Sequence, residues 1–268
     1  MLEAVLAAAL DHDITVNRVS QGSGAMLLTE AELREMAALG HSAGVEVSLF
    51  VGPREGWGVG AHPRSPDGAA HFSQLRGMRQ LTYAIEDIAR AVEAGIRSFL
   101  IADHGLLTLL RDMQVAGELP ADCCWKISVA MAPSNPASLR VLEQLGATTV
   151  NVPSDVTLIE LAEMRAAAAV PIDLYVESPD GLGGVVRGNE IADLVAVGAP
   201  LYAKFGLRNS RGLYPAGDHL LADACAIGRE KVRRAAVACE WLQRLDPSLV
   251  QSLPGAEGLY VPAAMVRP

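Results

Sequence analysis

The chain contains only three lysines, Lys126, Lys204 and Lys231, and every other strongly basic side chain is an arginine. Lys126 and Lys204 fall in segments whose apolar and polar residues alternate as they do in β-strands. Arginine cannot replace lysine as a Schiff-base nucleophile or as a titrating base. The pattern therefore indicates that amines are kept where chemistry needs them; the alternative is chance together with a structural ion pair.

The stretch from Pro171 to Asn209 holds two such strands, Ile172–Glu177 and Leu201–Phe205, with a helical run between them. Every second residue of a strand lies on the same face. The polar residues of these two faces are Asp173, Tyr175, Glu177, Tyr202 and Lys204. A strand–helix–strand unit makes its strands parallel, and parallel strands are usually apolar on both faces. Polar residues at alternate positions therefore indicate a site inside a barrel.

Glu177 and Lys204 end consecutive strands, so the sequence predicts that their charged groups meet at the mouth of the barrel. A carboxylate near an amine favours both charged forms, whereas burial opposes them. Such a pair can act as acid and base, or as a Schiff-base lysine with its proton shuttle; the alternative is a structural ion pair. The catalytic candidates are Glu177, Lys204, Lys126 and His104.

Further candidates are polar residues near the expected C-terminal ends of strands, where parallel barrels carry their active sites. The substrate-binding candidates are Asn17, Ser48, Asp103, Asn151, Arg187 and Arg208. Arg187 follows a glycine-rich stretch and Arg208 lies in GLRNSRG, so both could hold a phosphate or a carboxylate. Asp103 and His104 could bind a metal, form a base with its orienting carboxylate, or be ordinary loop residues.

These residues are positioned by a strand–helix unit that is repeated seven times. The predicted strands are Ile14–Ser20, Glu46–Val51, Ser98–Ala102, Trp125–Met131, Thr148–Val152, Ile172–Glu177 and Leu201–Phe205. The repeat predicts a TIM-type parallel (β/α) barrel that is incomplete or closed by a terminal segment such as Leu259–Val261. An open doubly wound sheet is the alternative fold. We expect one barrel domain over residues 1–246 and a C-terminal tail over residues 247–268.

The segment Gly52–Gly77 is too long for an ordinary loop between a strand and a helix, and it is rich in Gly, Pro, His and Arg. Long loops of this composition commonly serve as lids or binding loops. We therefore expect it to cover the C-terminal mouth of the barrel and to be mobile without ligand.

The composition excludes several classes of protein. The formal net charge is −9 and the pI is about 5.2, which gives no basic footprint for nucleic acid. No apolar run is long enough to span a membrane, and the N-terminal residues lack the basic start of a signal peptide. The four cysteines have neither zinc-site nor redox-motif spacing. We expect a cytoplasmic protein with a small-molecule substrate, and its assembly into a homo-oligomer remains open.

The order of motifs resembles a known family. The run AGIRSFLIADHGLLTLLRDM, followed by WKISVAMAPSNPASLRVLEQLGATTVNVPSDVTLIELAEM, is similar to the collagenase-like peptidases of unknown catalytic type, peptidase family thirty-two. The resemblance extends roughly from Ile14 to Glu177 and implies a TIM-type barrel. Many members carry a cysteine-rich segment after the strand that corresponds to Ile172–Val176, and several bind an iron–sulfur cluster there. That place reads ESPDGLGG here, without cysteine, which suggests a divergent branch with its own site.

Three functional hypotheses follow. The first is a small-molecule barrel enzyme, a lyase or hydrolase, that acts on an anionic or carbonyl substrate through Glu177 and Lys204 and needs no cofactor or metal. The second is a metal-dependent, peptidase-like hydrolase in which His104, Asp103 and Glu177 bind a divalent ion. The third is a non-catalytic barrel kept as a subunit or binding partner.

Overall fold

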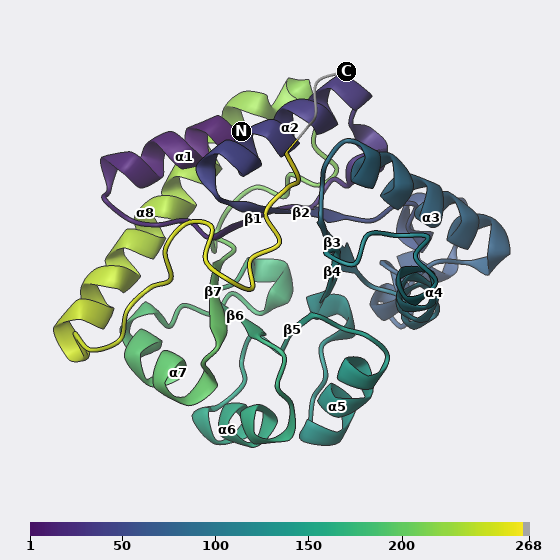
Figure 1. Cartoon of the computed structure of the whole chain (residues 1–268). Helices are drawn as coiled ribbons and strands as arrows, with labels where there is room; N and C mark the ends of the chain where they lie inside the picture. Colours follow the sequence, from purple (N-terminus) through teal and green to yellow (C-terminus); the bar gives the residue numbers. More distant parts are fainter. Residues whose placement is uncertain (265–268) are drawn as a thin grey trace.

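The computed structural model describes residues 1–264, which form a seven-stranded parallel sheet curved into an incomplete TIM-type barrel with helices around it (Figure 1). Each strand pairs with the next along the chain, in the order β1 to β7. The strands are β1 Arg18–Gln21, β2 Glu46–Phe50, β3 Ser98–Ile101, β4 Cys124–Ile127, β5 Thr149–Asn151, β6 Ile172–Glu177 and β7 Leu201–Phe205. The predicted fold class is therefore confirmed, including its incomplete form.

Helices cover the outside of the sheet. They are α1 Leu2–Asp11, α2 Glu30–Ala43, α3 Gly77–Glu93, α4 His104–Val115, α5 Pro136–Gln144, α6 Leu158–Ala167, α7 Ile191–Gly198 and α8 Leu221–Leu245. Thr29 and Thr157 begin α2 and α6 with capping boxes, in which Glu32 and Glu160 bond back to the capping residue. The outward strand residues, such as Phe99 and Ile127, are fully buried against these helices. The polar strand positions are left to face the barrel interior.

The first strand starts later than predicted. We expected Ile14–Ser20, but Ile14 and Val16 pack against a cluster of Val5, Ala8, Ala9 and Val232 from α1 and α8. Their apolar pattern reflects this contact and not a strand. The consequence is that Asn17 precedes β1 and lies at the N-terminal end of the barrel.

The C-terminal segment after α8 crosses the N-terminal end of the barrel (Figure 1). Asn17 donates to the Ser252 carbonyl over 2.9 Å, and the Gly255 amide donates to the Gly44 carbonyl over 2.8 Å. Leu259–Val261, which we had considered as a closing strand, is not a strand; the Tyr260 amide instead donates to Glu46 over 3.3 Å. Within residues 1–264 there is no eighth strand, and no backbone ladder joins β7 to β1.

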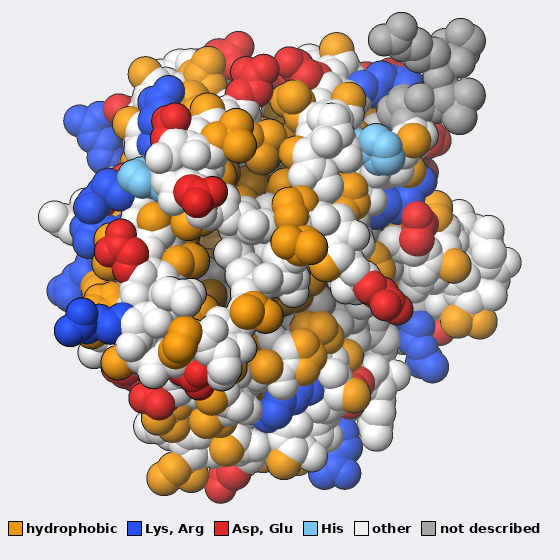
Figure 2. All heavy atoms as spheres, turned by 60° about the vertical axis from the view of Figure 1, so that its left-hand side comes forward, with side chains coloured by type: hydrophobic (Ala, Val, Ile, Leu, Met, Phe, Trp, Pro, Cys, Tyr) orange, Lys and Arg blue, Asp and Glu red, His pale blue; other side chains and the backbone are white. Residues whose placement is uncertain are grey.

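Figure 2 shows the side of the molecule that carries α1, α8 and the C-terminal segment. Hydrophobic side chains are spread over the middle of this face, and basic side chains gather along its left edge. No helix in the described part of the chain is long and apolar enough to cross a bilayer.

Candidate active site inside the barrel

A compact ion network occupies the part of the barrel interior that is nearer to the N-terminal ends of the strands, which we call the lower layer. Arg18 on β1 contacts Glu46 on β2 through Nε over 2.7 Å and Asp173 on β6 through Nη1 over 2.9 Å. The side chains of Glu46 and Asp173 are 0 % exposed and that of Arg18 is 4 % exposed. The guanidinium carbon of Arg18 also lies 3.6 Å from the ring centre of Tyr202 on β7. These contacts join β1 to β6 and β7 where the backbone ladder is missing.

Lys126 reaches across the barrel from β4. Its Nζ atom lies 2.7 Å from Asp173 Oδ1 and 3.5 Å from the Ser20 hydroxyl on β1. Lys126 is 1 % exposed, whereas Ser20 is exposed to solvent. Ser20 therefore connects a buried amine with the outside.

Lys204 on β7 has different surroundings. Its Nζ atom donates a hydrogen bond to the Asn151 side-chain carbonyl on β5 and lies 4.0 Å from the ring centre of Tyr175. The Asn151 amide group donates in turn to the Ile127 carbonyl, which fixes the orientation of its oxygen. Lys204 is half-buried and, among residues 1–264, has no carboxylate within ion-pair distance.

Burial and charge set the ionisation of these groups. Burial lowers the pKa of Lys126 to about 7, although Asp173 opposes this shift. Burial also lowers the pKa of Lys204 to about 8, with Asp173 opposing and Arg18 and Lys231 adding to the reduction. Burial alone would raise the pKa of Asp173, but Lys126 and Arg18 outweigh it and hold the pKa below its ordinary value. The site thus combines an ionised carboxylate with two amines that can lose a proton near neutral pH.

The predicted contact between Glu177 and Lys204 is wrong. A bulge between Tyr175 and Glu177 places Glu177 opposite Phe205, and Tyr175 opposite Lys204. Glu177 accepts a hydrogen bond from the Arg208 amide over 2.9 Å and lies 3.8 Å from Arg234 on α8. Its carboxylate therefore holds the loop after β7 instead of serving the amine.

Other predicted site residues also lie outside the cluster. Asn17 is at the opposite end of the barrel, as described above. Arg187 is buried and donates to the Val156 carbonyl over 2.6 Å and to Glu190 over 2.9 Å, so its guanidinium supports the loop before α7. Arg208 is largely exposed and lies 3.4 Å from Asp180. Ser48, by contrast, is fully buried on β2, and its hydroxyl has no hydrogen-bond partner within residues 1–264.

The pair Asp103–His104 begins α4. Asp103 caps the helix by accepting from the Leu106 amide over 2.9 Å, and it also accepts from the Leu75 amide over 3.2 Å. His104 is exposed and lines a surface hollow with Met131, Ser134 and Asn135. In the described part of the chain no three His, Cys, Asp or Glu side chains are grouped so that they could hold a metal. The alternative metal site of His104, Asp103 and Glu177 is therefore not formed.

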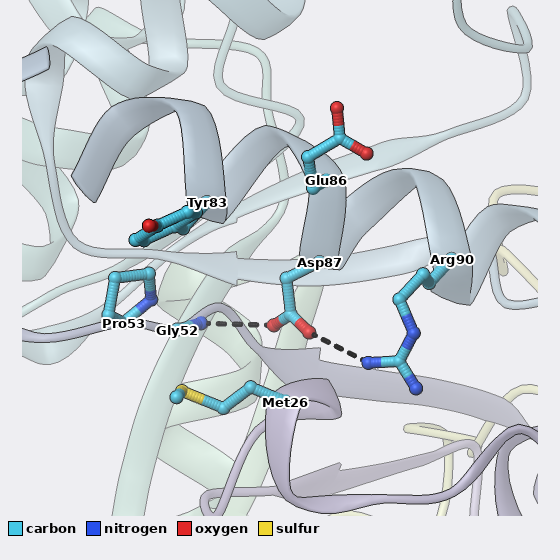
Figure 3. A pocket seen from close by; sticks show the side chains of 7 residues that line it. All are labelled: Met26, Gly52, Pro53, Tyr83, Glu86, Asp87 and Arg90. Atoms are coloured by element: carbon cyan, nitrogen blue, oxygen red, sulfur yellow. Dashed lines mark hydrogen bonds and ion pairs between the residues drawn. The ribbon is translucent and has the colours of Figure 1, made fainter. Parts of the chain in front are cut away.

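The long loop after β2 lies at the C-terminal end of the strands, as expected. Arg54 in this loop donates to the Gly22 carbonyl just after β1 over 2.6 Å, and Leu75 contacts Asp103 just after β3. The start of the loop is fixed by Asp87 of α3, which accepts from the Gly52 amide over 3.2 Å (Figure 3). Asp87 lies in a hollow outside the barrel, and Arg90 lies 3.7 Å away. The loop's mobility remains a prediction.

Sequence reasoning missed Asp173 and Arg18 as the centre of the interior network. Both stand at inward positions of strands. The alternation placed Asp173 on the polar face with Tyr175 and Glu177, but it could not show that Arg18 and Lys126 pair with this carboxylate. The role of Arg54 had no such signal, because the arginine lies in a loop without periodic pattern.

Comparison with known proteins identifies the middle of the chain. The model of peptidase family U32 matches residues 72–178. Over these residues the chain is similar to peptidase family U32. This U32 segment extends from the end of the long loop through β6, so it contributes Lys126, Asn151 and Asp173 to the interior. No curated protein matches the chain.

Solved mandelate oxidase structures show the same fold at low sequence identity, and two further structures are similar to a lesser degree. A mandelate oxidase with (S)-2-phenylpropionate is 14% identical over 95% of this chain and 69% of its own, with a TM-score of 0.50. D-psicose 3-epimerase from Clostridium cellulolyticum H10 is 9% identical over 90% and 93%, with a TM-score of 0.48. The U32 peptidase Mk0906 is 18% identical over 62% of each chain, with a TM-score of 0.40. The present chain therefore spans 62% of the length of that peptidase.

Proposed function

We propose that this divergent U32 barrel is a lyase that forms a Schiff base between Lys204 and a small carbonyl substrate carrying an anionic group. The observation that carries the proposal is the environment of Lys204. Its amine is half-buried, its hydrogen-bond partner is the neutral side chain of Asn151, and burial lowers its pKa to about 8. A lysine desolvated beside other cations is activated as a nucleophile in this way.

The reaction begins when the neutral amine of Lys204 adds to the substrate carbonyl carbon. The carbonyl oxygen takes one proton from the attached amine and a second from an acid in the site, it leaves as water, and a carbon–nitrogen double bond forms. The resulting iminium takes up the electron pair of the neighbouring carbon–carbon bond, which breaks to give an enamine, and the departing carbon becomes a carbonyl as its hydroxyl group loses a proton to a base in the site. Protonation of the enamine and addition of water then release the second product and restore the amine.

The Asp173–Lys126 pair supports these proton transfers. Asp173 stays ionised between Arg18 and Lys126, so Lys126 is held in place whether or not it carries a proton. Lys126 is too buried to meet the substrate directly, but the exposed hydroxyl of Ser20 lies 3.5 Å from its Nζ atom. Ser20 can therefore pass a proton between Lys126 and a substrate in the mouth. The scheme gives Lys126 the shuttle role that the sequence had suggested for Glu177.

The test is reductive trapping of the whole chain with pyruvate and sodium cyanoborohydride, followed by peptide mapping. Because the chain has three lysines, mass spectrometry can assign an adduct to Lys126, Lys204 or Lys231. We expect the adduct at Lys204 and none in Lys204→Met, whereas Lys231→Met should still form it, more slowly at neutral pH because Lys231 helps to lower the pKa of Lys204. An adduct distributed equally over the three lysines, or none at all, would contradict the proposal and favour a non-catalytic barrel.

The proposed setting is the cytoplasm. All four cysteines are free, and Cys123 and Cys124 are buried, which is typical of proteins in a reducing compartment. The proposed partner is the small-molecule substrate alone, and the amine itself serves as the covalent catalyst without metal or cofactor.

A further inference from the structure

Arg54 is a buried arginine without a carboxylate partner at the C-terminal end of the barrel. It follows β2 in the long loop and is 5 % exposed. Its Nη2 atom donates to the Gly22 carbonyl over 2.6 Å, whereas its buried Nε atom has no hydrogen-bond partner in the described part of the chain. Within residues 1–264 no acidic side chain forms an ion pair with it.

Two aromatic rings hold the guanidinium. Its central carbon lies 3.4 Å from the ring centre of Phe50, the last residue of β2, and 4.1 Å from that of Trp57. Contacts of this kind stabilise a cation electrostatically through the negative faces of the rings. The rings offset only part of the cost of burying a charge that has no ion-pair partner. Burial lowers the pKa of Arg54 to about 10, although the carboxylate of Asp87, beyond ion-pair distance, opposes this shift, and the side chain remains cationic at neutral pH.

Arg54 lies at the end of the barrel toward which Lys204 is placed. The carbonyl that Arg54 contacts belongs to Gly22, the residue directly after β1. The ring of Tyr214 packs onto Gly22 so closely that a Cβ atom there would lie 2.9 Å from it. Arg54 follows the C-terminal end of β2, and Lys204 is the second-last residue of β7, so both lie toward the C-terminal end of the barrel.

We propose that Arg54 binds the carboxylate or phosphate group of the substrate at the C-terminal mouth of the barrel. The inference rests on the proposed function in one respect, because it supplies the anionic group of the carbonyl substrate. An arginine matches both anions by its planar set of donors, and an anion would complete the hydrogen bonding of the unpartnered edge. Held by Phe50 and Trp57, the guanidinium is already oriented, which lowers the entropic cost of binding.

The experiment measures the binding of inorganic phosphate and, separately, pyruvate by titration calorimetry at pH 7 in low salt. Wild type should bind at least one of them, and the stronger of the two identifies the anion as phosphate or carboxylate. Arg54→Met should weaken binding by about tenfold or more, and Arg54→Lys by less, because lysine keeps the charge without the planar donors. Arg76→Met is the matched control: Arg76 lies in the same loop, is exposed and is 3.7 Å from Glu55, so its loss should leave binding unchanged.

A structural role of Arg54 predicts a different outcome. If the arginine served only to hold Gly22, then Arg54→Met would lower the melting temperature without ligand and leave the anion affinity as it was. Arg54→Gln, which can still donate to the Gly22 carbonyl, covers the case in which the methionine variant does not fold. Unchanged affinity in Arg54→Gln, or wild type that binds neither anion, would overturn the inference.

The two proposals can fail independently. Loss of anion binding in Arg54→Met without any lysine adduct in wild type would refute the Schiff base and keep the anion site. An adduct at Lys204 with anion affinity that does not depend on Arg54 would refute the anion site and keep the Schiff base. Lys204→Met should retain Arg54-dependent phosphate binding in either case.

Discussion

The barrel interior has two polar layers, a lower one near the N-terminal ends of the strands and an upper one near their C-terminal ends. They differ in whether the buried cations have carboxylate partners. In the lower part, Arg18 contacts two carboxylates, those of Glu46 and Asp173, and all three side chains are sealed from solvent. In the upper part, Lys204 is half-buried and its partner is the neutral amide of Asn151. Lys126 belongs to both, because it pairs with Asp173 below and faces the exposed Ser20 above.

This difference separates structural from chemical charges. A buried charge whose opposite charge is fixed beside it contributes to the closure of the barrel but has no capacity left for a substrate. An amine whose only partner is neutral can still bind or react with a substrate, and burial brings its pKa toward neutrality. The presence of a lysine inside a barrel is therefore a weaker indication of catalysis than whether its partner is charged or neutral.

The largest effect should come from Lys204. Lys204→Arg keeps the charge but loses the compact nucleophilic amine, so adduct formation with pyruvate should fall more than about a hundredfold. Lys204→Met should show the same loss, with a melting temperature equal to or above that of wild type, because an apolar side chain avoids the desolvation of the amine. Adduct yield and melting curves measure both. A normal adduct yield in Lys204→Arg would contradict the distinction between structural charges in the lower layer and a reactive amine in the upper layer.

Asp173 tests the lower layer. Asp173→Asn removes the negative charge that lies between the buried cations Arg18 and Lys126. The free energy of unfolding should therefore drop by about 3–5 kcal/mol. Urea denaturation measures this change. Asp112→Asn on exposed α4 is the control and should stay within about 0.5 kcal/mol of wild type. If Asp173→Asn is as stable as its control, the lower ion network does not hold the barrel together.

The pH dependence of trapping tests the upper layer. The reactive form of Lys204 is the neutral amine, and its lowered pKa of about 8 means that this form becomes dominant near pH 8. The initial rate of adduct formation should rise about tenfold per pH unit below that value and level off above it. An ordinary lysine would continue to rise to about pH 10. A rate still rising above pH 9 would show that the burial of Lys204 does not activate it.

Asp87 provides a third kind of buried charge, outside the barrel, where burial outweighs the attraction of Arg90 at 3.7 Å. Burial raises its pKa to about 6, so the folded protein takes up a proton at a higher pH than the unfolded chain does. Stability should therefore fall by about 1–2 kcal/mol as the pH rises from about 4 to about 6. Asp87→Asn should abolish this fall, as chemical denaturation at each pH can show. Identical pH profiles for the variant and wild type would mean that Asp87 titrates normally.

Glu177 should have the smallest effect. Glu177→Gln keeps an acceptor for the Arg208 amide and changes only the charge near Arg234, so stability should change by about 1 kcal/mol or less. The adduct yield at Lys204 should stay within about twofold of wild type. A large loss of yield would restore Glu177 to the site that the sequence suggested.

The sequence predicted strands best where alternation was unbroken. Ile172–Glu177 and Leu201–Phe205 have the predicted bounds, because their polar inward faces and apolar outward faces both meet a partner. The first strand was misplaced because Ile14 and Val16 are apolar for a helix contact. The alternation of polar and apolar residues predicts that a side chain faces the interior, but it does not predict where along the barrel axis that side chain lies. The bulge in β6 therefore separates Glu177 from Lys204, although the two residues end neighbouring strands.

The missing ladder between β7 and β1 affects how the chain reaches its final shape. Each hydrogen-bonded strand pair joins strands that follow one another along the chain, so the sheet can grow one neighbouring strand at a time, but each step must bring together parallel strands that a helix separates, which slows folding. The last step is different, since Arg18 must meet Asp173 and Tyr202 from the other end of the sheet. Closure thus depends on Coulomb attraction and ring stacking between distant side chains. Ionic strength should therefore influence the rate of this final docking step more than the rates of the steps before it.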